Sequence, residues 1–261
     1  MKKGFSLVEL SIVIIIIGLL FVGVSAGSSL IQQAKLRTIM NEMRMIETAI
    51  KTFVVAYNDL PGDMPNAYDI WGDDCGPNSL AGAGCNGNDN GIIGATISTG
   101  LAPSETERYR FWQHMSLAGV IDGSFTGSEN DSCFTSSTIP CHNSNNSFES
   151  RFSDDLLFVL WDLSYVPASS LPESWNYVNI FKIDRNSSGY TTNDAGGVFT
   201  PQDLYNIDKK LDDGKAMSGS IQGNTSGGSS QVCFDVTSFD YLIYENTRNC
   251  NIYWIDKRLF N

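Results

Sequence analysis

Histidine is scarce in this chain, and the two histidines stand outside any recognisable catalytic or metal motif. They are His114 and His142, and no CxxC pair accompanies them. The spacing therefore gives no zinc-site signature. Catalytic triads assemble from distant positions, so their absence from the linear sequence is not decisive, but no local nucleophile or metal motif is present. We predict a protein that is not an enzyme, with His114 as a packed or surface residue.

Positive charge is also limited. The chain has 17 Lys and Arg against 29 Asp and Glu, which gives a formal net charge of -12. Nucleic-acid binding depends on basic patches that neutralise phosphates. No such patch is visible in the sequence, so we predict no nucleic-acid partner.

Proline is absent before Pro61, which permits one unbroken helix from the N-terminus. Between Phe5 and Val24 the only strongly polar side chain is Glu9. About 20 apolar residues in a helix cross the roughly 30 Å hydrocarbon core of a bilayer. We predict a transmembrane segment at residues 5–28.

The helical pattern continues beyond the apolar segment and becomes amphipathic over residues 29–60. Polar side chains fill one face, and the other carries apolar residues at spacings of three and four: Leu36, Ile39, Met43, Ile46, Ile50 and Phe53. Asn58 to Gly62 is a stop signal, so one helix is predicted from Phe5 to Tyr57. Its apolar stripe predicts docking on a globular domain; a free coiled-coil stalk is the alternative.

Glu9 is an unusual residue for its position. A carboxylate inside a bilayer costs about 2.5–3.5 kcal/mol even on lenient scales, so an intramembrane acid indicates a function. A buried charge is tolerated mainly when it is paired. The alternative is a polar residue near the headgroups of an uncleaved signal anchor.

The residues on either side of the Gly4–Phe5 bond resemble the leader of the type IV pilin and type II secretion pseudopilin family. Lys2, Lys3 and Gly4 precede Phe5, and FSLVEL leads into the apolar run. The resemblance implies that prepilin peptidase cleaves between Gly4 and Phe5, leaving residues 1–4 as leader peptide, and that Phe5 is N-methylated. It also implies that Glu9 pairs with the Phe5 amine of a neighbouring subunit during assembly.

This resemblance implies a structural subunit of a type IV pilus or a type II secretion pseudopilus. The lysines predict a cytoplasmic N-terminus, so the chain is expected in the bacterial inner membrane with residues 61–261 in the periplasm, and later in a filament. Its expected partners are other pilin subunits, the prepilin peptidase and N-methyltransferase, and the inner-membrane assembly platform. No proline lies near Ala26, where major pilins commonly kink, which favours a pseudopilin or minor pilin. A minor tip pilin that acts as an adhesin or binds exoproteins is the alternative.

Cysteine is absent from the first 74 residues. All six cysteines lie beyond the membrane segment: Cys75, Cys85, Cys133, Cys141, Cys233 and Cys250. An even number on the exported side predicts disulfides formed in an oxidising compartment. Pairing in sequence order closes three compact loops and is favoured, although crossed pairs stay open. The pair Cys233 and Cys250 resembles the C-terminal disulfide loop of many type IV pilins.

No cofactor is predicted with the exception of calcium, for which two loops are candidates. The first has oxygen side chains at Asn86, Asn88 and Asn90, followed by Gly91. This matches the front half of a calcium loop, but Ile97 stands where an EF-hand has its closing acid. An Asn/Gly turn that needs no ion is the alternative.

The second candidate follows a predicted helix that starts at Thr200 and Pro201. Asp208, Asp212 and Asp213 gather at its C-terminal end, where the helix dipole disfavours anions. Three carboxylates at this place favour a cation. Nearby lysines, or simple solvation, are the alternatives.

We predict an α+β fold for the remainder of the chain, with the long helix packed on a C-terminal antiparallel sheet that has long loops. Helices are expected from a cap at Ser104 to Leu117 and at 154–163, and strands at 177–183, 231–236, 241–244 and 252–255.

Overall fold

The computed structural model describes ten stretches of the chain. They are residues 6–75, 85–93, 107–128, 144–153, 156–162, 179–185, 197–225, 233–235, 237–248 and 250–255. The helices in these stretches are α1 (Leu7–Tyr57), α2 (Ala67–Trp71), the 3-10 helix η1 (Gly72–Cys75), α3 (Glu107–Leu117) and α4 (Pro201–Leu211). The strands are β1 (Phe148–Glu149), β2 (Leu156–Asp162), β3 (Asn179–Arg185), β4 (Ile221–Thr225) and β5 (Cys250–Trp254).

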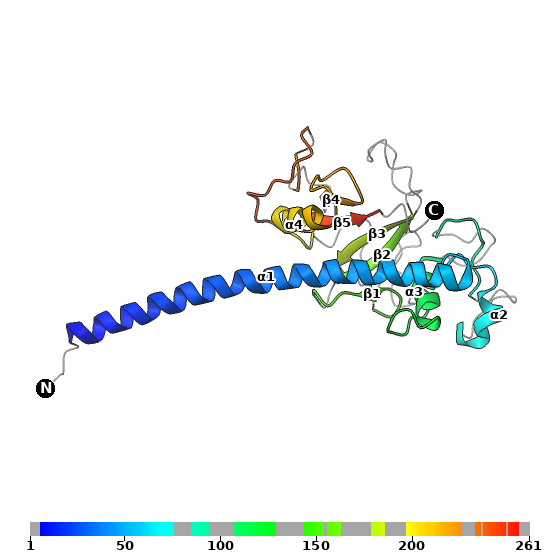
Figure 1. Ribbon diagram of the computed structural model, residues 1–261, viewed down its shortest axis with the longest axis horizontal. Coiled ribbons are helices and arrows are strands. Elements are labelled where there is room, and N and C mark those ends of the chain that lie inside the picture. Colours follow the sequence, from blue (N-terminus) through cyan, green and yellow to red (C-terminus); the bar gives the residue numbers. More distant parts are fainter. Residues whose placement is uncertain are drawn as a thin grey trace, which may run out of the picture.

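The long helix α1 is continuous over 51 residues. It is gently curved, and its first half projects away from the domain (Figure 1). Ser6 caps its N-terminus, and Asn58 ends it in the left-handed conformation with φ 56°. Asparagine is one of the few non-glycine residues that adopt this conformation at low cost. The predicted end at Tyr57 is confirmed, and the helix begins two residues after the predicted Phe5.

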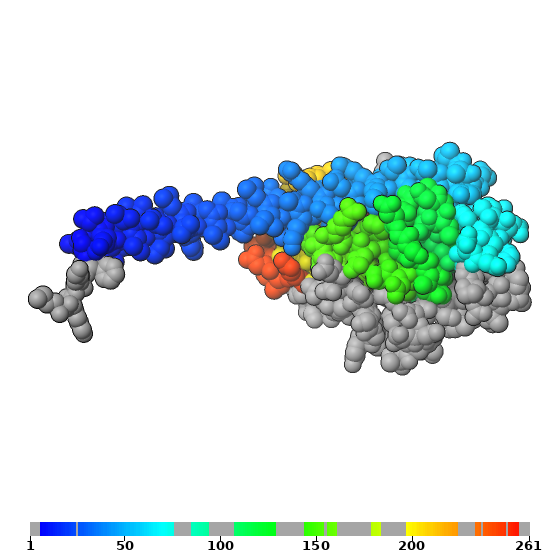
Figure 2. Space-filling view, turned by 90° about the horizontal axis from the view of Figure 1, so that it is seen from below, coloured from blue at the N-terminus to red at the C-terminus, as the bar shows by residue number. Residues whose placement is uncertain are grey.

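The two halves of α1 differ in burial. Ile39, Ile46, Ile50 and Phe53 are fully buried in the second half, where they belong to the same core as the strands. The domain covers this half, whereas the first half stands free of it (Figure 2). The amphipathic pattern therefore docks on the domain as predicted, and the α1 of this chain is not a free stalk.

The sheet is antiparallel, with the strand order β1-β2-β3-β5-β4. Helix α3 packs against it through aromatic side chains: the Phe111 ring lies 5.6 Å from that of Phe181, and the Trp112 ring 5.8 Å from that of Phe148. The predicted α+β architecture is confirmed.

The predicted helix at 154–163 is wrong, because its described residues form the strand β2. Side chains from Leu156 to Leu160 are all buried, successive ones included. A strand covered on both faces gives a continuous apolar run, which periodicity cannot separate from a buried helix. Pairing of β2 with β3 along its whole length decides in favour of the strand.

Two predicted strands are also absent from the described residues between Cys233 and Cys250. Only an isolated bridge joins Phe234 and Tyr241 there. The strand β4 was missed, since IQGNT has little strand character, and it forms by pairing with β5. The predicted strands at 177–183 and 252–255 correspond to β3 and β5. The predicted helix to Leu117 corresponds to α3, while its proposed cap Ser104 lies outside the described residues.

Candidate functional site

The N-terminus of α1 holds Glu9 in a capping box. The Ser6 N–H donates to Glu9 Oε2 at 2.8 Å, and the Val8 N–H donates to Ser6 Oγ at 3.3 Å. These bonds satisfy backbone donors that have no partner in the helix, and the carboxylate lies at the positive end of the helix dipole. Gly4 and Phe5 lie outside the described residues. Glu9 thus has a partner in its own subunit, which sequence reasoning missed although the S-x-x-E spacing is its signature.

The surface of the first half of α1 is almost entirely apolar. Its large side chains are 48–86% exposed: Leu7, Val8, Leu10, Ile12, Val13, Ile14, Ile15, Ile16, Ile17, Leu19, Leu20, Phe21, Val22, Val24, Leu30 and Ile31. The most apolar 18-residue window has a mean hydropathy of 2.9, and none of it is buried. By length and composition α1 can cross a membrane. Such a surface needs lipid or other apolar helices around it.

The N-terminal leader is the part of the chain that matches a known family model. Residues 1–25 match the family model of the prokaryotic N-terminal methylation motif. The chain carries the class III leader of type IV pilins and pseudopilins. No curated protein and no solved structure matches it. The motif indicates a pilin-like structural protein, and it implies processing by prepilin peptidase and assembly with other pilin subunits.

Two disulfides brace the domain of this pilin-like chain. Cys75 is bonded to Cys85, and Cys233 to Cys250, so pairing in sequence order is confirmed for these four cysteines. Cys133 and Cys141 lie outside the described residues. The second disulfide joins Cys250, the first residue of β5, to Cys233, which follows β4 in the sequence.

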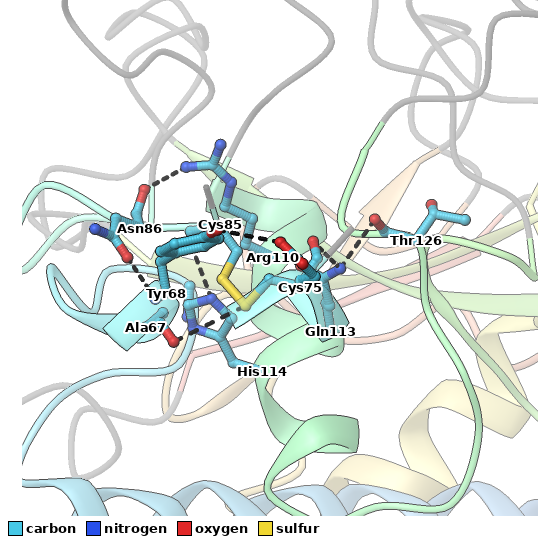
Figure 3. The surroundings of a disulfide bond; sticks show 11 residues. Ala67, Tyr68, Cys75, Cys85, Asn86, Arg110, Gln113, His114 and Thr126 are labelled. Carbon is cyan, nitrogen blue, oxygen red and sulfur yellow. Dashed lines mark hydrogen bonds between the residues drawn. A yellow bond between two sulfur atoms is a disulfide. The ribbon is translucent and has the colours of Figure 1, made fainter. Parts of the chain in front are cut away.

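The side chains of α3 hold the first disulfide loop (Figure 3). The Gln113 Nε2 donates to the Cys75 carbonyl at 2.8 Å and to that of Thr126 at 3.1 Å. Arg110 donates to the Asn86 carbonyl. Hydrogen bonds from α3 therefore hold Cys75 and Asn86, on the two sides of this disulfide.

His114 lies at the centre of this region and is fully buried. Its Nδ1 accepts the Gly62 N–H at 2.9 Å, so Nε2 carries the proton and donates to the Cys85 carbonyl at 3.0 Å. Burial lowers the pKa of the imidazole to about 3, the hydrogen bond to Cys85 opposes this, and the Arg110 charge adds to it. His114 is therefore a packed residue and not a surface residue, the other possibility left by the sequence. Its two hydrogen bonds join the turn after α1, at Gly62, to the disulfide at Cys85.

The asparagine loop is held by protein donors and acceptors. Asn86 Oδ1 accepts the Tyr68 N–H at 2.7 Å, and Asn90 Oδ1 accepts the Ile92 N–H at 2.7 Å. The Asp63 carboxylate accepts the N–H groups of Asn90 and Gly91 at 3.2 and 2.7 Å.

Asn88 completes the loop. Its N–H donates to Glu107 Oε1 at 3.0 Å, and its own Oδ1 is buried and has no hydrogen-bond partner among the described residues. Two of the three candidate calcium ligands therefore support an Asn/Gly turn, and calcium at this loop stays a prediction.

The three aspartates at the C-terminal end of α4 come together as predicted. One oxygen of each of Asp208, Asp212 and Asp213 lies within 4.8 Å of the others. The predicted cap at Thr200 and the start at Pro201 are also confirmed, and the helix ends at Leu211 with Asp212 as its C-cap. This cluster is the only group of three acidic, cysteine or histidine side chains in the described stretches with that spacing.

Each carboxylate of the cluster already accepts hydrogen bonds. Asp208 accepts from Gly214 N–H at 3.1 Å and from Tyr241 O–H at 2.7 Å. Asp212 accepts the Ile221 N–H at 3.1 Å. Burial raises the pKa of Asp208 to about 7; the bonds from Tyr241 and Gly214 oppose this, while Asp213 and Asp212 add to it. A proton or a cation relieves the repulsion of these groups, and carboxylate oxygens are suitable ligands for calcium.

Proposed function

We propose that this chain is a structural subunit of a type IV pilus or a type II secretion pseudopilus. One observation carries the proposal: the methylation motif at residues 1–25 extends into a single helix that has an exposed apolar surface in its first half and packs on the domain in its second half. The domain cannot cover the first half without breaking α1. Lipid surrounds it before assembly, and the apolar helices of other subunits surround it in the filament.

Assembly on this proposal exchanges one apolar environment for another. Moving α1 from lipid to a bundle of similar helices changes apolar burial little, so the polar contact of Glu9 sets the register. Glu9 Oε2 accepts the Ser6 N–H, whereas Oε1 accepts no hydrogen bond within the described residues. The Phe5 amine of a neighbouring subunit can bind Oε1 without breaking the cap.

The same helix supports the proposed processing and location. α1 starts at Leu7 with its cap at Ser6, so cleavage between Gly4 and Phe5 leaves both intact. The chain is held in the inner membrane with the domain in the periplasm, and the assembly platform then moves it into the filament. A minor tip subunit that binds a surface or an exoprotein is the second role this architecture supports.

Mass spectrometry of sheared filaments tests the proposal. We expect the chain in the filament fraction, starting at Phe5 and carrying one methyl group on its amine. A dominant band identifies the major subunit, and a trace amount identifies an accessory or tip subunit. Absence of the chain from all filament fractions, or an uncleaved N-terminus within them, contradicts the proposal.

We also propose that calcium binds the cluster of Asp208, Asp212 and Asp213, because no other described group brings three such ligands together. Calcium in about tenfold excess over its Kd should stabilise the fold by about 1.4 kcal/mol, and more at higher excess. The melting temperature of the full chain in detergent should therefore rise with calcium and fall with chelator. Asp212→Asn should remove this response, whereas Asp122→Asn, at an exposed turn, should keep it. A melting temperature that does not respond to calcium contradicts the site.

A further inference from the structure

A small cavity lies where α1 enters the domain. Its volume is about 80 Å³, and its lining includes Gln32, Lys35, Ser153 and Arg248. One water needs about 10–15 Å³ of such space, so the cavity has room for a group the size of a phosphate. All four side chains offer hydrogen-bond donors, and two of them are cations.

The two cations have no acidic partner among the residues that the structure describes. Lys35 Nζ lies 6.0 Å from the centroid of the Phe152 ring, and neither Lys35 nor Arg248 forms an ion pair in the stretches that the structure describes. The Gln32 amide donates one hydrogen to Asp203 Oδ1 at 3.1 Å and has a second one available. In a chain of net charge -12, two cations that share one cavity and have no ion pair within the described stretches indicate an anion.

The cavity lies at the depth of lipid headgroups when α1 spans a bilayer. Leu30 and Ile31 end the exposed apolar run, at 67% and 62% exposure. The predicted transmembrane segment at residues 5–28 ends seven residues before Lys35, so the Lys35 backbone lies about 10 Å beyond the hydrocarbon core. A headgroup layer is about 5–8 Å thick on each side of that core. Helical side chains point back toward the N-terminus of the helix, so the long Lys35 side chain reaches this layer.

The edge of the domain beside the cavity is suited to the same layer. Residues 237–248, in orange to red, form the part of the domain nearest to the free half of α1 in both views (Figures 1 and 2). This loop exposes Phe239, Ile243 and Tyr244, at 46%, 47% and 72%. Aromatic side chains with one polar end are favoured at the membrane surface.

We propose that Lys35 and Arg248 bind the phosphate of an anionic phospholipid headgroup while the chain is anchored in the membrane. The inference rests on the proposed function, since it requires α1 in a bilayer. The guanidinium of Arg248 suits two phosphate oxygens at once, and the Lys35 ammonium supplies a point charge. The acidic domain is repelled by an anionic membrane as a whole, so this local contact sets its orientation until the subunit is extracted.

Native mass spectrometry of the full chain, released from detergent with added phosphatidylglycerol or phosphatidylcholine, tests the proposal. We expect phosphatidylglycerol to bind more tightly than phosphatidylcholine. The double variant Lys35→Gln/Arg248→Gln should weaken phosphatidylglycerol binding at least about tenfold, because it removes both charge-assisted contacts with the phosphate. Arg44→Gln/Lys51→Gln is the matched control: it makes the same charge change further along α1 and should bind normally.

Three results overturn the proposal. Equal phosphatidylglycerol binding by the Lys35/Arg248 variant removes these residues from the site. Displacement of the lipid by inorganic phosphate at equal concentration assigns the cavity to free phosphate. Unchanged lipid binding with lost filament incorporation assigns the two cations to a neighbouring subunit. Lipid binding is measured without assembly, so its failure leaves the filament proposal standing, and the absence of the chain from filaments leaves the lipid result standing.

Discussion

Glu9→Gln is expected to leave the chain in the membrane with its leader cleaved and to reduce its incorporation into filaments by at least about tenfold. Glutamine keeps an oxygen that accepts the Ser6 N–H, so the helix cap survives, but the charge that binds a neighbouring amine is lost. A buried ion pair that loses one partner costs about 3–5 kcal/mol, since the other charge stays uncompensated. The uncompensated charge here is the Phe5 amine of the adjacent subunit.

The Ser6→Ala variant tests whether Glu9 acts by pairing with the amine of a neighbouring subunit or by capping α1. It removes the hydroxyl that accepts the Val8 N–H at 3.3 Å and leaves the Glu9 charge in place. Loss of an N-cap costs about 1 kcal/mol, which is small for a helix anchored at its other end by a buried core. Quantitative immunoblots of sheared filaments and of membranes should show near-normal incorporation of this variant. The reverse pattern, with Glu9→Gln assembling and Ser6→Ala failing, would identify the cap as the function of Glu9.

Elements encoded by local residues were predictable from the sequence. The stop at Asn58, the apolar stripe that ends at Phe53 and the start of α4 at Thr200 and Pro201 each depend on residues within one or two turns. Capping and periodicity act at this range. The leader belongs to the same class, since its motif is contained in residues 1–25.

Elements determined by distant contacts were not predictable. The strand β2 was assigned to a helix because its burial on both faces comes from tertiary packing, and β4 exists through its pairing with β5. The site residues divide in the same way. The three aspartates were found from their place at a helix end, whereas Tyr241, which donates to Asp208 from 33 residues away, carries no local signal.

The His114 network is a third case of this kind, because Gly62 and Cys85 meet the imidazole only in the folded chain. Its consequence is a pH dependence. An unfolded histidine titrates near pH 6.5, whereas the folded pKa is about 3. Between these values the unfolded chain binds a proton that the folded chain does not. The stability from neutral His114 is therefore full above pH 6.5 and is lost as the pH falls toward 3, by about 1.4 kcal/mol per pH unit.

Asp208 acts in the opposite direction over an overlapping range. Its pKa is raised to about 7 from 3.8, so the folded chain holds a proton that the unfolded chain releases. The stability from protonated Asp208 is full below pH 3.8 and is lost as the pH rises through 7. In the presence of chelator the two slopes oppose each other, and the wild-type chain should show a weak pH dependence between pH 4.5 and 6.5.

Single variants should separate the contributions of His114 and Asp208 to the pH dependence of stability. With Asp208→Asn, the free energy of unfolding should fall by about 2.3 kcal/mol from pH 6.5 to pH 4.5, because His114 then acts unopposed. With His114→Gln, stability at neutral pH should drop, since one buried backbone partner of the imidazole loses its bond, and acid should now stabilise the chain. Urea unfolding at the two pH values measures both slopes. A wild-type slope that survives unchanged in both variants would mean that groups other than His114 and Asp208 carry the pH dependence.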